Sequence, residues 1–271
     1  MDKLRACVMG WPVSHSLSPK LHGYWLKYYA IEGVYTAREV LPEVLGTALR
    51  ELHKNGWRGS NLTIPHKEAA LGYVDHLDDA AKAIGAVNTV VVHDGKLYGS
   101  NSDAYGFTEN IRAYLPERTK KAVILGAGGA AKAVCYALLQ LGFTDIHISN
   151  RSLPRAKEIA RQFGGVVTCV PWEKRKSALM DADLLVNATS LGMTGKEALI
   201  LDLDPLPKHA LVTDIVYAPL MTPLLETAKA RGNPVVDGLG MLLHQAVPGF
   251  EAWFGVRPEV TRALRNAVLG L

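Results

Sequence analysis

The sequence has little cysteine: three thiols, Cys7, Cys135 and Cys169, are spread over 271 residues. An odd number of distant cysteines excludes a disulfide scaffold, and their apolar surroundings predict reduced thiols in a core. The sequence also lacks an apolar run near the roughly 18 residues of a membrane span. Its first residues include no apolar stretch typical of a signal peptide. We therefore expect a cytoplasmic protein without membrane contact.

Neither the charge nor the histidines point to nucleic acid or to metal. The 30 Lys and Arg against 26 Asp and Glu give a formal net charge of +4, and the basic residues are scattered. This mild excess suits anionic small molecules and is too weak for a nucleic-acid surface. The nine histidines show no metal-ligand spacing such as H-E-x-x-H, so we predict no metal. The expected partner is a small-molecule substrate, and assembly into a homodimer is left open.

What the sequence does contain is an alternation of short apolar stretches with helix-length segments. Strands are predicted at Ala6–Met9, Val34–Glu39, Gly59–Ile64, Val87–Val92, Ala122–Leu125, Asp145–Ser149, Val166–Val170, Leu184–Asn187, Leu211–Ile215 and Pro234–Val236. Helices are predicted at Leu17–Ala30, Leu45–Asn55, His66–Tyr73 and Ala130–Leu141. The Asp94-Gly95 pair predicts a tight hairpin turn, because Gly and Asp tolerate positive φ. The alternation is typical of an α/β fold with parallel sheets covered by helices.

The length suggests about two domains at roughly 150 residues each. We place a helical connector at 104–116 and a second joint at 237–239. Residues 1–104 plus 240–271 are predicted to form an α/β substrate-binding and catalytic domain. The helical segment from Gly240 is too short to be a domain alone, so we expect it to pack back on the first half. Residues 105–239 are predicted to form a Rossmann-type cofactor domain with a doubly wound parallel sheet.

A glycine-rich turn marks the predicted cofactor site. Gly126, Gly128 and Ala131 fill the three positions of the G-x-G-x-x-G/A fingerprint, after a predicted strand and at the start of a predicted helix. The first glycine permits the tight turn, the second lets the backbone approach a pyrophosphate, and the alanine keeps helix and strand close. The N-terminus of the helix offers unpaired N–H groups to the phosphates. This context favours a dinucleotide site over a plain structural turn.

The end of the next predicted strand indicates NADP rather than NAD. An NAD-specific site usually carries Asp or Glu here to accept from the ribose 2′-hydroxyl. This chain has Asn150, Arg151 and Ser152 instead, with Arg155 one helical turn after Arg151. Two guanidinium groups bind a 2′-phosphate through charge-assisted hydrogen bonds. The alternative is that both arginines are solvated residues at a helix start.

Polar residues follow the predicted strands of the first half, where ligands of α/β sheets bind. Ser16 and Ser18 lie before a predicted helix, so their hydroxyls are either helix caps or anion ligands. Lys67 ends the segment that begins at Asn61, and a lysine at such a point is more often solvated than catalytic. The residue pattern alone leaves both questions open.

These segments together resemble the shikimate dehydrogenase family. The signatures are Ser-His-Ser-Leu-Ser-Pro at 14–19, Asn-Leu-Thr-Ile-Pro-His-Lys at 61–67, Gly-Ala-Val-Asn-Thr at 85–89, Asn-Ser-Asp at 101–103, Gly-Ala-Gly-Gly-Ala at 126–130, Asn-Arg-Ser at 150–152, Asn-Ala-Thr-Ser at 187–190 and Asp-Gly-Leu-Gly-Met-Leu with a following Gln at 237–245. Each is weak alone, whereas the whole series in this order is specific. The resemblance implies reversible NADPH-dependent reduction of 3-dehydroshikimate to shikimate, in the chorismate pathway to aromatic amino acids.

The resemblance also implies a role for individual residues. Lys67 and Asp103 match the catalytic pair of the family, and they are matched as substrate-binding residues as well. The other implied substrate-binding residues are Ser16, Ser18, Thr63, Asn88, Tyr217 and Gln245. The implied cofactor-binding residues are Asp79, Gly126, Ala127, Gly128, Gly129, Ala130, Asn150, Arg151, Ser152, Arg155, Thr189, Ile215, Gly238 and Met241.

Departures from the family pattern remove no group that the chemistry needs. Ser102 stands where the family commonly has Thr, and Ile215 replaces a frequent Met. His66 beside Lys67 is expected to be a surface histidine, the alternative being that it tunes the pKa of the lysine. Burial would lower the pKa of Lys67 and Asp103 would raise it, so its role as acid/base or as charged hydrogen-bond donor stays open.

Two other functions are compatible with such a sequence. A quinate/shikimate dehydrogenase of the same fold would have looser substrate choice, but its quinate activity is usually NAD-linked, which Arg151 and Arg155 disfavour. A non-catalytic Rossmann protein that senses nucleotide is disfavoured because Lys67, Asp103 and the substrate hydroxyls are all retained.

Overall fold

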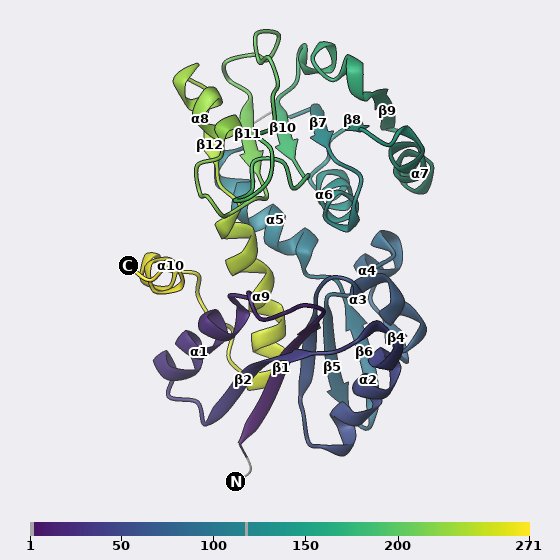
Figure 1. The fold of residues 1–271 in the computed structure, drawn as a ribbon, viewed down its shortest axis with the longest axis vertical. Helices are drawn as coiled ribbons and strands as arrows, with labels where there is room; N and C mark the ends of the chain where they lie inside the picture. Colours follow the sequence, from purple (N-terminus) through teal and green to yellow (C-terminus); the bar gives the residue numbers. More distant parts are fainter. Residues whose placement is uncertain (1–2, 117–118) are drawn as a thin grey trace. The chain divides into compact units, whose positions relative to one another are not determined.

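A computed structural model describes residues 3–116 and 119–271, which fall into two units. Unit 1 comprises Met1–Ser102 and Leu243–Leu271, and unit 2 comprises Asp103–Leu242. Figure 1 shows both as α/β structures with helices around a sheet. This confirms the predicted fold class. Which ligand each domain binds stays a prediction.

Unit 1 contains a mixed six-stranded sheet in the order β2-β1-β3-β5-β6-β4. Its strands are β1 (Leu4–Gly10), β2 (Gly33–Glu39), β3 (Gly59–Leu62), β4 (His76–Leu77), β5 (Thr89–His93) and β6 (Lys96–Ser100). Its helices are α1 (Ser18–Tyr28), α2 (Leu45–Lys54), α3 (His66–Ala69), α4 (Asp79–Ile84) and α10 (Arg262–Leu269), with α9 (Leu239–Phe254) continuing into it from unit 2.

The sheet of unit 1 is mixed rather than parallel throughout, and the hairpin predicted at Asp94-Gly95 is confirmed. Strand β5 runs antiparallel to both β3 and β6. The cause is the hairpin between β5 and β6, where Asp94 and Gly95 have φ of 49° and 77°. A two-residue turn can join only antiparallel strands, because a parallel pair needs a long crossover.

Helices cover both faces of this sheet. Alternate residues of β1, Cys7 and Met9, pack with Leu45 and Leu49 of α2 in one core cluster. On the opposite face, Trp253 of α9 donates through its indole N–H to Val90 O at 3.0 Å. The sheet is therefore buried on both sides, and loops at its strand ends remain for a ligand.

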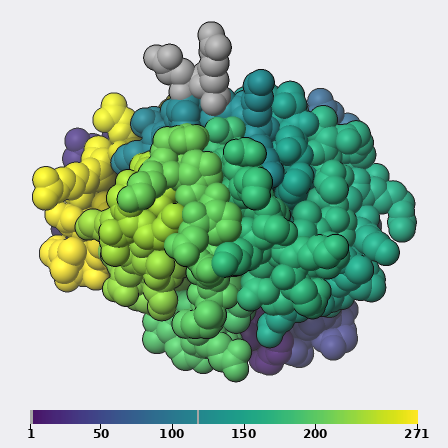
Figure 2. All heavy atoms as spheres, turned by 90° about the horizontal axis from the view of Figure 1, so that it is seen from above, coloured from purple at the N-terminus to yellow at the C-terminus, as the bar shows by residue number. Residues whose placement is uncertain are grey.

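Unit 2 contains a wholly parallel six-stranded sheet in the order β12-β11-β10-β7-β8-β9. Its strands are β7 (Lys121–Leu125), β8 (Asp145–Asn150), β9 (Val167–Pro171), β10 (Leu184–Asn187), β11 (Leu211–Asp214) and β12 (Val235–Val236). Its helices are α5 (Asp103–Ile111), α6 (Gly129–Gln140), α7 (Leu153–Phe163) and α8 (Pro223–Ala230). Figure 2 shows segments of this unit, teal to light green, packed against one another. This strand order reverses between β7 and β10, the switch point at which doubly wound sheets bind dinucleotides.

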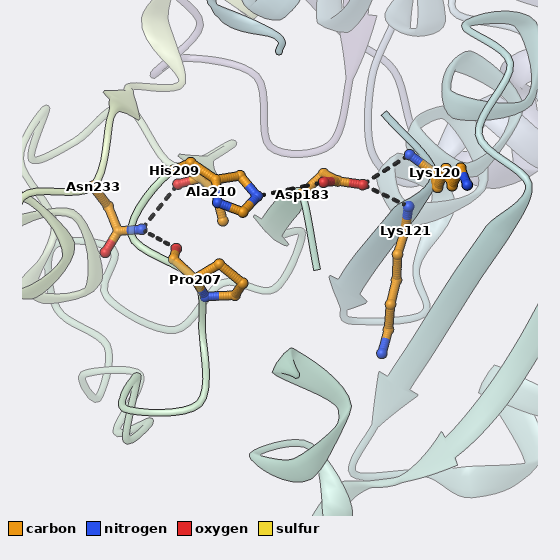
Figure 3. A network of polar contacts seen from close by, with 7 residues as sticks. All are labelled: Lys120, Lys121, Asp183, Pro207, His209, Ala210 and Asn233. Atoms are coloured by element: carbon orange, nitrogen blue, oxygen red, sulfur yellow. Dashed lines mark hydrogen bonds and ion pairs between the residues drawn. The ribbon is translucent and has the colours of Figure 1, made fainter. Parts of the chain in front are cut away.

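A polar network fixes the amino edge of this sheet (Figure 3). The Asp183 carboxylate accepts from the backbone N–H of Lys120 at 2.8 Å and of Lys121 at 3.0 Å, and His209 Nε2 lies 3.6 Å from its other oxygen. Asn233 donates to the carbonyls of Pro207 and Ala210. These bonds hold the starts of β7, β10 and β11 together, and the carboxyl edge is left to carry the site.

The cysteines differ slightly from the prediction of buried core thiols. Cys7 and Cys135 are buried, but Cys169 on β9 is only half-buried, because β9 is the edge strand of its sheet. Among the described residues, no helix has the length and apolarity to cross a membrane. Within the same residues, no group of three or more His, Cys, Asp or Glu side chains is arranged to hold a metal ion.

Candidate active site

The glycine-rich turn after β7 is tightly packed at its first glycine. Gly126 has a φ of 112°, a conformation that L side chains rarely adopt. A Cβ built there would lie 2.6 Å from the carbonyl oxygen of Ala188. The backbone N–H of Gly126 donates to Ser149 O at 2.8 Å, and that of Ala188 donates to Leu125 O at 2.7 Å. The turn therefore lies directly beside the chain that leaves β10.

The second part of the turn is open. A Cβ at Gly128 or Gly129 would meet no atom within 4 Å. Helix α6 begins at Gly129, directly after the turn, and Ala131 is fully buried where the helix packs on the sheet. Ala127 and Ala130 complete the loop and are half-buried. This open, unbranched backbone at a helix N-terminus fits a pyrophosphate.

The end of β8 presents the predicted 2′-phosphate residues. Asn150 closes the strand and donates from Nδ2 to Ser152 O at 3.0 Å. Ser152 occupies the N-cap position of α7, and Arg155 lies in the first turn of that helix. The side chains of Arg151, Ser152 and Arg155 are exposed. Two exposed guanidinium groups at a helix start give positive charge where an anion would bind.

The remaining predicted cofactor residues of unit 2 follow the neighbouring strands. Thr189 follows β10, and Ile215 follows β11 with its N–H donating to Asn187 O at 3.0 Å. A Cβ on Gly238, after β12, would lie 2.4 Å from the carbonyl of Ile215. Met241 is buried in the first turn of α9. The carboxyl edge of one sheet thus gathers residues that follow five adjacent strands, β12, β11, β10, β7 and β8.

Asp79 is separate from that group. It lies in unit 1 as the first residue of α4, and its side chain is 97% exposed beside Lys82 at 3.5 Å. The ion pair gives it a local partner on its own helix. Its role toward the cofactor stays a prediction.

Ser16 and Ser18 follow β1 in unit 1, and the capping alternative for Ser18 is wrong. The N-cap position of α1 belongs to Leu17, without a side-chain cap, and Ser18 is the first helical residue. The Ser16 hydroxyl oxygen accepts from the Ser18 N–H at 3.3 Å, which leaves its own O–H directed elsewhere. Ser18 is buried beside Tyr35, whose phenol pKa is raised by burial.

The segment with Thr63 and Lys67 follows β3. Thr63 N–H donates to Met9 O at 2.9 Å, and a Cβ on Gly10 would lie 2.4 Å from Thr63 Cγ2, so this segment lies beside the end of β1. Lys67 is half-buried in α3, and its carbonyl accepts from Val87 N–H at 2.8 Å. This bond ties the lysine's turn to the residue before Asn88.

His66 is not the surface histidine that the sequence predicts. Its side chain is 1% exposed, and Nε2 lies 2.8 Å from Val40 O. Burial lowers the pKa of its imidazole, so a neutral ring is favoured. The short helix α3 turns this residue inward, where it anchors the turn that carries Lys67.

Asn88 is held by a buried hydrogen-bond network. Its Oδ1 accepts from Ser102 N–H at 2.8 Å and from the hydroxyls of Thr89 and Ser102. Asn61 donates to Thr89 Oγ1 at 3.1 Å and accepts from Tyr35 at 2.6 Å. These donors, from Thr89 and Ser102, fix the orientation of the Asn88 side chain within unit 1.

The other predicted substrate residues lie in separate parts of the chain. Asp103 opens α5 directly after Ser102 and is buried. Gln245 is half-buried on the unit 1 part of α9. Tyr217 belongs to unit 2, and burial raises the pKa of its phenol. The pairing of Lys67 with Asp103 stays a prediction.

Sequence reasoning missed two hydrogen-bonded pairs of buried polar residues, Tyr35 with Asn61 and Asn187 with Asp214. Tyr35 and Asn61 stabilise the segment of Asn88, and Asn187 with Asp214 links the ends of β10 and β11. The available signal was a polar residue at the last position of an apolar strand, as at Asn187 and Asp214. Such residues are costly to bury without a partner, so they mark a local network.

The fold and the site together define a class: a two-unit α/β protein whose Rossmann-type unit carries a dinucleotide-binding edge. Family models then match nearly the whole chain: the shikimate dehydrogenase substrate binding domain at 8–90, shikimate / quinate 5-dehydrogenase at 112–216, and the shikimate 5′-dehydrogenase C-terminal domain at 238–269. The chain belongs to the shikimate dehydrogenase family.

Individual relatives agree with this family assignment. The NADP⁺ shikimate dehydrogenase of Paramagnetospirillum magneticum is 56% identical over 97% of both chains, and that of Mesorhizobium japonicum is 52% identical over 98% of this chain and 95% of its own. Shikimate 5-dehydrogenase of Thermus thermophilus, solved with NADP(H) and shikimate, is 40% identical with a TM-score of 0.89 over 98% of this chain and 99% of its own. Quinate dehydrogenase of Corynebacterium glutamicum, solved with NAD, is 31% identical with a TM-score of 0.93 over 100% of both chains.

Proposed function

We propose that this protein catalyses the reversible NADPH-dependent reduction of 3-dehydroshikimate to shikimate, in the pathway to chorismate and aromatic amino acids. The observation that carries the proposal is the near full-length match to NADP⁺ shikimate dehydrogenases, together with the retention of every polar group expected at both sheet edges. In this reaction hydride adds to the carbonyl carbon C3, and a proton joins its oxygen.

The cofactor edge supports NADPH as the reductant. The open turn at Gly128 and Gly129 accommodates a pyrophosphate, and the exposed Arg151 and Arg155 match a 2′-phosphate. When bound, NADPH supplies the hydride. The chain itself orients the cofactor through the loops after β7, β8, β10 and β11.

The polar edge of unit 1 supports the choice of substrate. The Ser16 and Ser18 hydroxyls suit a carboxylate, and the amide of Asn88, which the hydrogen bond from Ser102 holds in place, suits a ring hydroxyl. Lys67 gives a proton or a charged hydrogen bond to the reacting oxygen, and Asp103 orients it. Two bonds support this pairing: Val87 N–H to Lys67 O, and Ser102 N–H to Asn88, since Ser102 directly precedes Asp103.

A second candidate is a dehydrogenase that also oxidises quinate. The likeness to the NAD-bound quinate dehydrogenase of Corynebacterium glutamicum favours it. The closer identity to NADP⁺ shikimate dehydrogenases and the two arginines after β8 favour the first candidate.

Turnover with shikimate or quinate, and with NADP⁺ or NAD⁺, tests the proposal through the absorbance of the reduced nicotinamide. We expect shikimate with NADP⁺ to give the highest kcat/KM. Arg151→Glu should raise the KM for NADP⁺ by about tenfold or more, because it removes a charge-assisted bond to the 2′-phosphate, and should leave NAD⁺ use unchanged. Equal turnover with both cofactors, unaffected by Arg151→Glu, would contradict the NADP assignment. No turnover with any pair would favour a nucleotide sensor.

Location and assembly belong to the same proposal. The free thiols Cys7 and Cys135 fit a reducing cytoplasm. Light scattering at assay concentration distinguishes a monomer from a homodimer.

A further inference from the structure

Asp214 is a fully buried carboxylate at the carboxyl end of β11, and the proposed mechanism does not use it. Its hydrogen-bond partners are all neutral. Asn187 Nδ2 lies 3.0 Å from each carboxylate oxygen, Val216 N–H donates to Oδ1 at 2.9 Å, and Thr222 Oγ1 donates to Oδ2 at 2.7 Å. Burial without a cation raises the pKa of this carboxyl group. A group that is costly to bury is expected to have a specific task.

The partners of Asp214 connect it to two loops of the cofactor edge. The Oδ1 of Asn187 accepts from Thr189 N–H at 3.1 Å and from Thr189 Oγ1 at 2.7 Å. The same Asn187 side chain donates to Leu191 O at 3.0 Å. On the other side, Val216 stands between Ile215 and Tyr217. One carboxylate therefore fixes the position of the loop after β10 relative to the loop after β11.

A role limited to helix α8 does not account for this arrangement. Thr222 is the N-cap of α8 and accepts from Leu225 N–H. The hydrogen bond from Thr222 to Asp214 fixes the start of α8, whereas the hydrogen bonds from Asn187 and Val216 fix the two loops. The carboxylate makes all of them at once.

The contacts also explain why the residue is Asp rather than Asn. Asn187 Nδ2 approaches both oxygens of Asp214 equally. An amide at 214 would place an NH₂ group at one of those positions, so two donors would face each other in a buried site. Rotating Asn187 to avoid this would turn its Nδ2 toward the Thr189 N–H. Only a group with two acceptors satisfies the network.

We propose that Asp214 is a positioning residue, which acts through Asn187 and Val216 to place Thr189 and Ile215 against the nicotinamide half of the dinucleotide. The inference rests on the proposed function, because it takes these loops to bind NADP(H). Asp214 itself is not assigned to the catalytic pair or to direct cofactor contacts.

Calorimetric binding of two probes separates positioning from general destabilisation. NADP⁺ would contact the whole edge, whereas adenosine 2′,5′-bisphosphate carries only the adenosine half that Arg151 and Arg155 would hold. For Asp214→Asn we expect the Kd for NADP⁺ to rise about tenfold, from the loss of correctly placed hydrogen bonds. The Kd for adenosine 2′,5′-bisphosphate should stay within about twofold of wild type.

Thr222→Val is the matched control, since it removes one hydrogen bond to the same carboxylate but leaves Asn187 and Val216 in place. It should lower the melting temperature and leave the Kd for NADP⁺ unchanged. If Asp214→Asn does not fold, Asn187→Ala cuts the same tie to Thr189, with a rise in the Kd for NADP⁺ expected. The inference is overturned if a folded Asp214→Asn or Asn187→Ala binds NADP⁺ as wild type does, or loses both probes equally. Wild type that binds no NADP⁺ would instead overturn the proposed cofactor, and the inference with it.

Discussion

At the scale of single residues, unit 1 buries one polar ring in an aromatic core. His22 of α1 is fully buried, stacks on Tyr35 with ring centroids 3.9 Å apart, and lies near Trp25, Phe250 and Trp253. Among the described residues, neither ring nitrogen makes a hydrogen bond of good geometry, and the nearby Asn61 side chain only partly offsets the effect of burial on the ring. Burial lowers the pKa of His22 from 6.5 to about 3. The folded protein therefore holds this ring neutral.

This burial predicts an acid-sensitive fold. Because the pKa of His22 is lower in the folded than in the unfolded chain, its contribution to stability is complete above pH 6.5 and is lost as the pH falls toward about 3. Each pH unit within that window costs about 1.4 kcal/mol of unfolding free energy. The slope of unfolding free energy against pH reports the number of protons taken up on unfolding. In His22→Phe this number should fall by about one, as measured by urea denaturation from pH 7.5 to 4.5.

The matched control is His53→Gln, since His53 is exposed. The slope of unfolding free energy against pH should be the same in His53→Gln as in wild type. Parallel slopes for wild type and His22→Phe would show that His22 is not the acid-sensitive group.

At the scale of elements, the sequence predicts strands better than it predicts the polar residues that link them. Runs such as Leu184–Asn187 are buried on both faces and are apolar up to their last residue, so their limits follow from composition. The short helix α4 was missed because six residues give too little periodicity. Its signals are the capping Asp78, which accepts from Ala81 N–H, and Gly85 at φ 73°.

In the candidate site, too, local motifs are predicted well and contacts between distant residues are not. The loop at Gly126 follows from a local pattern, since the strand, turn and helix are contiguous in sequence. The Asn187–Asp214 pair does not, because 27 residues separate its members. The inward position of His66 depends likewise on Val40, from a different strand end. Tertiary contacts of this kind are invisible to periodicity and to local motifs.

The amino edge of the unit 2 sheet gives a prediction for stability. Asp183 accepts from two backbone N–H groups, and its side chain is only 17% exposed. Asp183→Ala should lower the unfolding free energy by about 1–3 kcal/mol, because two donors lose their partner. The KM for NADP⁺ should stay unchanged, since this edge is opposite to the cofactor edge of the same sheet. Urea denaturation and steady-state kinetics measure the two quantities.

Asp202→Ala serves as the control for that variant. Asp202 pairs with Lys176 at the surface, where ion pairs contribute little to stability. An equal loss of stability in both variants, or a raised KM for NADP⁺ in Asp183→Ala, would contradict the role given to Asp183.

At the scale of the whole molecule, most of the candidate site residues of each unit lie at the carboxyl ends of its parallel strands. In unit 1 these are the ends of β1 and β3, with the segment of Asn88 beside them. In unit 2 they are the ends of β7, β8, β10 and β11. The proposed reaction draws on both sets, since the substrate is assigned to one and NADPH to the other. In the proposed reaction, the proton transfer depends on Lys67.

Steady-state kinetics of Lys67→Ala with shikimate and NADP⁺ tests this account most directly. General acid/base work typically contributes about 10²–10⁴-fold to the rate. We predict that kcat falls within that range while the KM for each ligand changes by less than about threefold, because the lost interaction acts mainly in the transition state. An unchanged kcat with a raised KM for shikimate would make Lys67 a binding residue and contradict the mechanism.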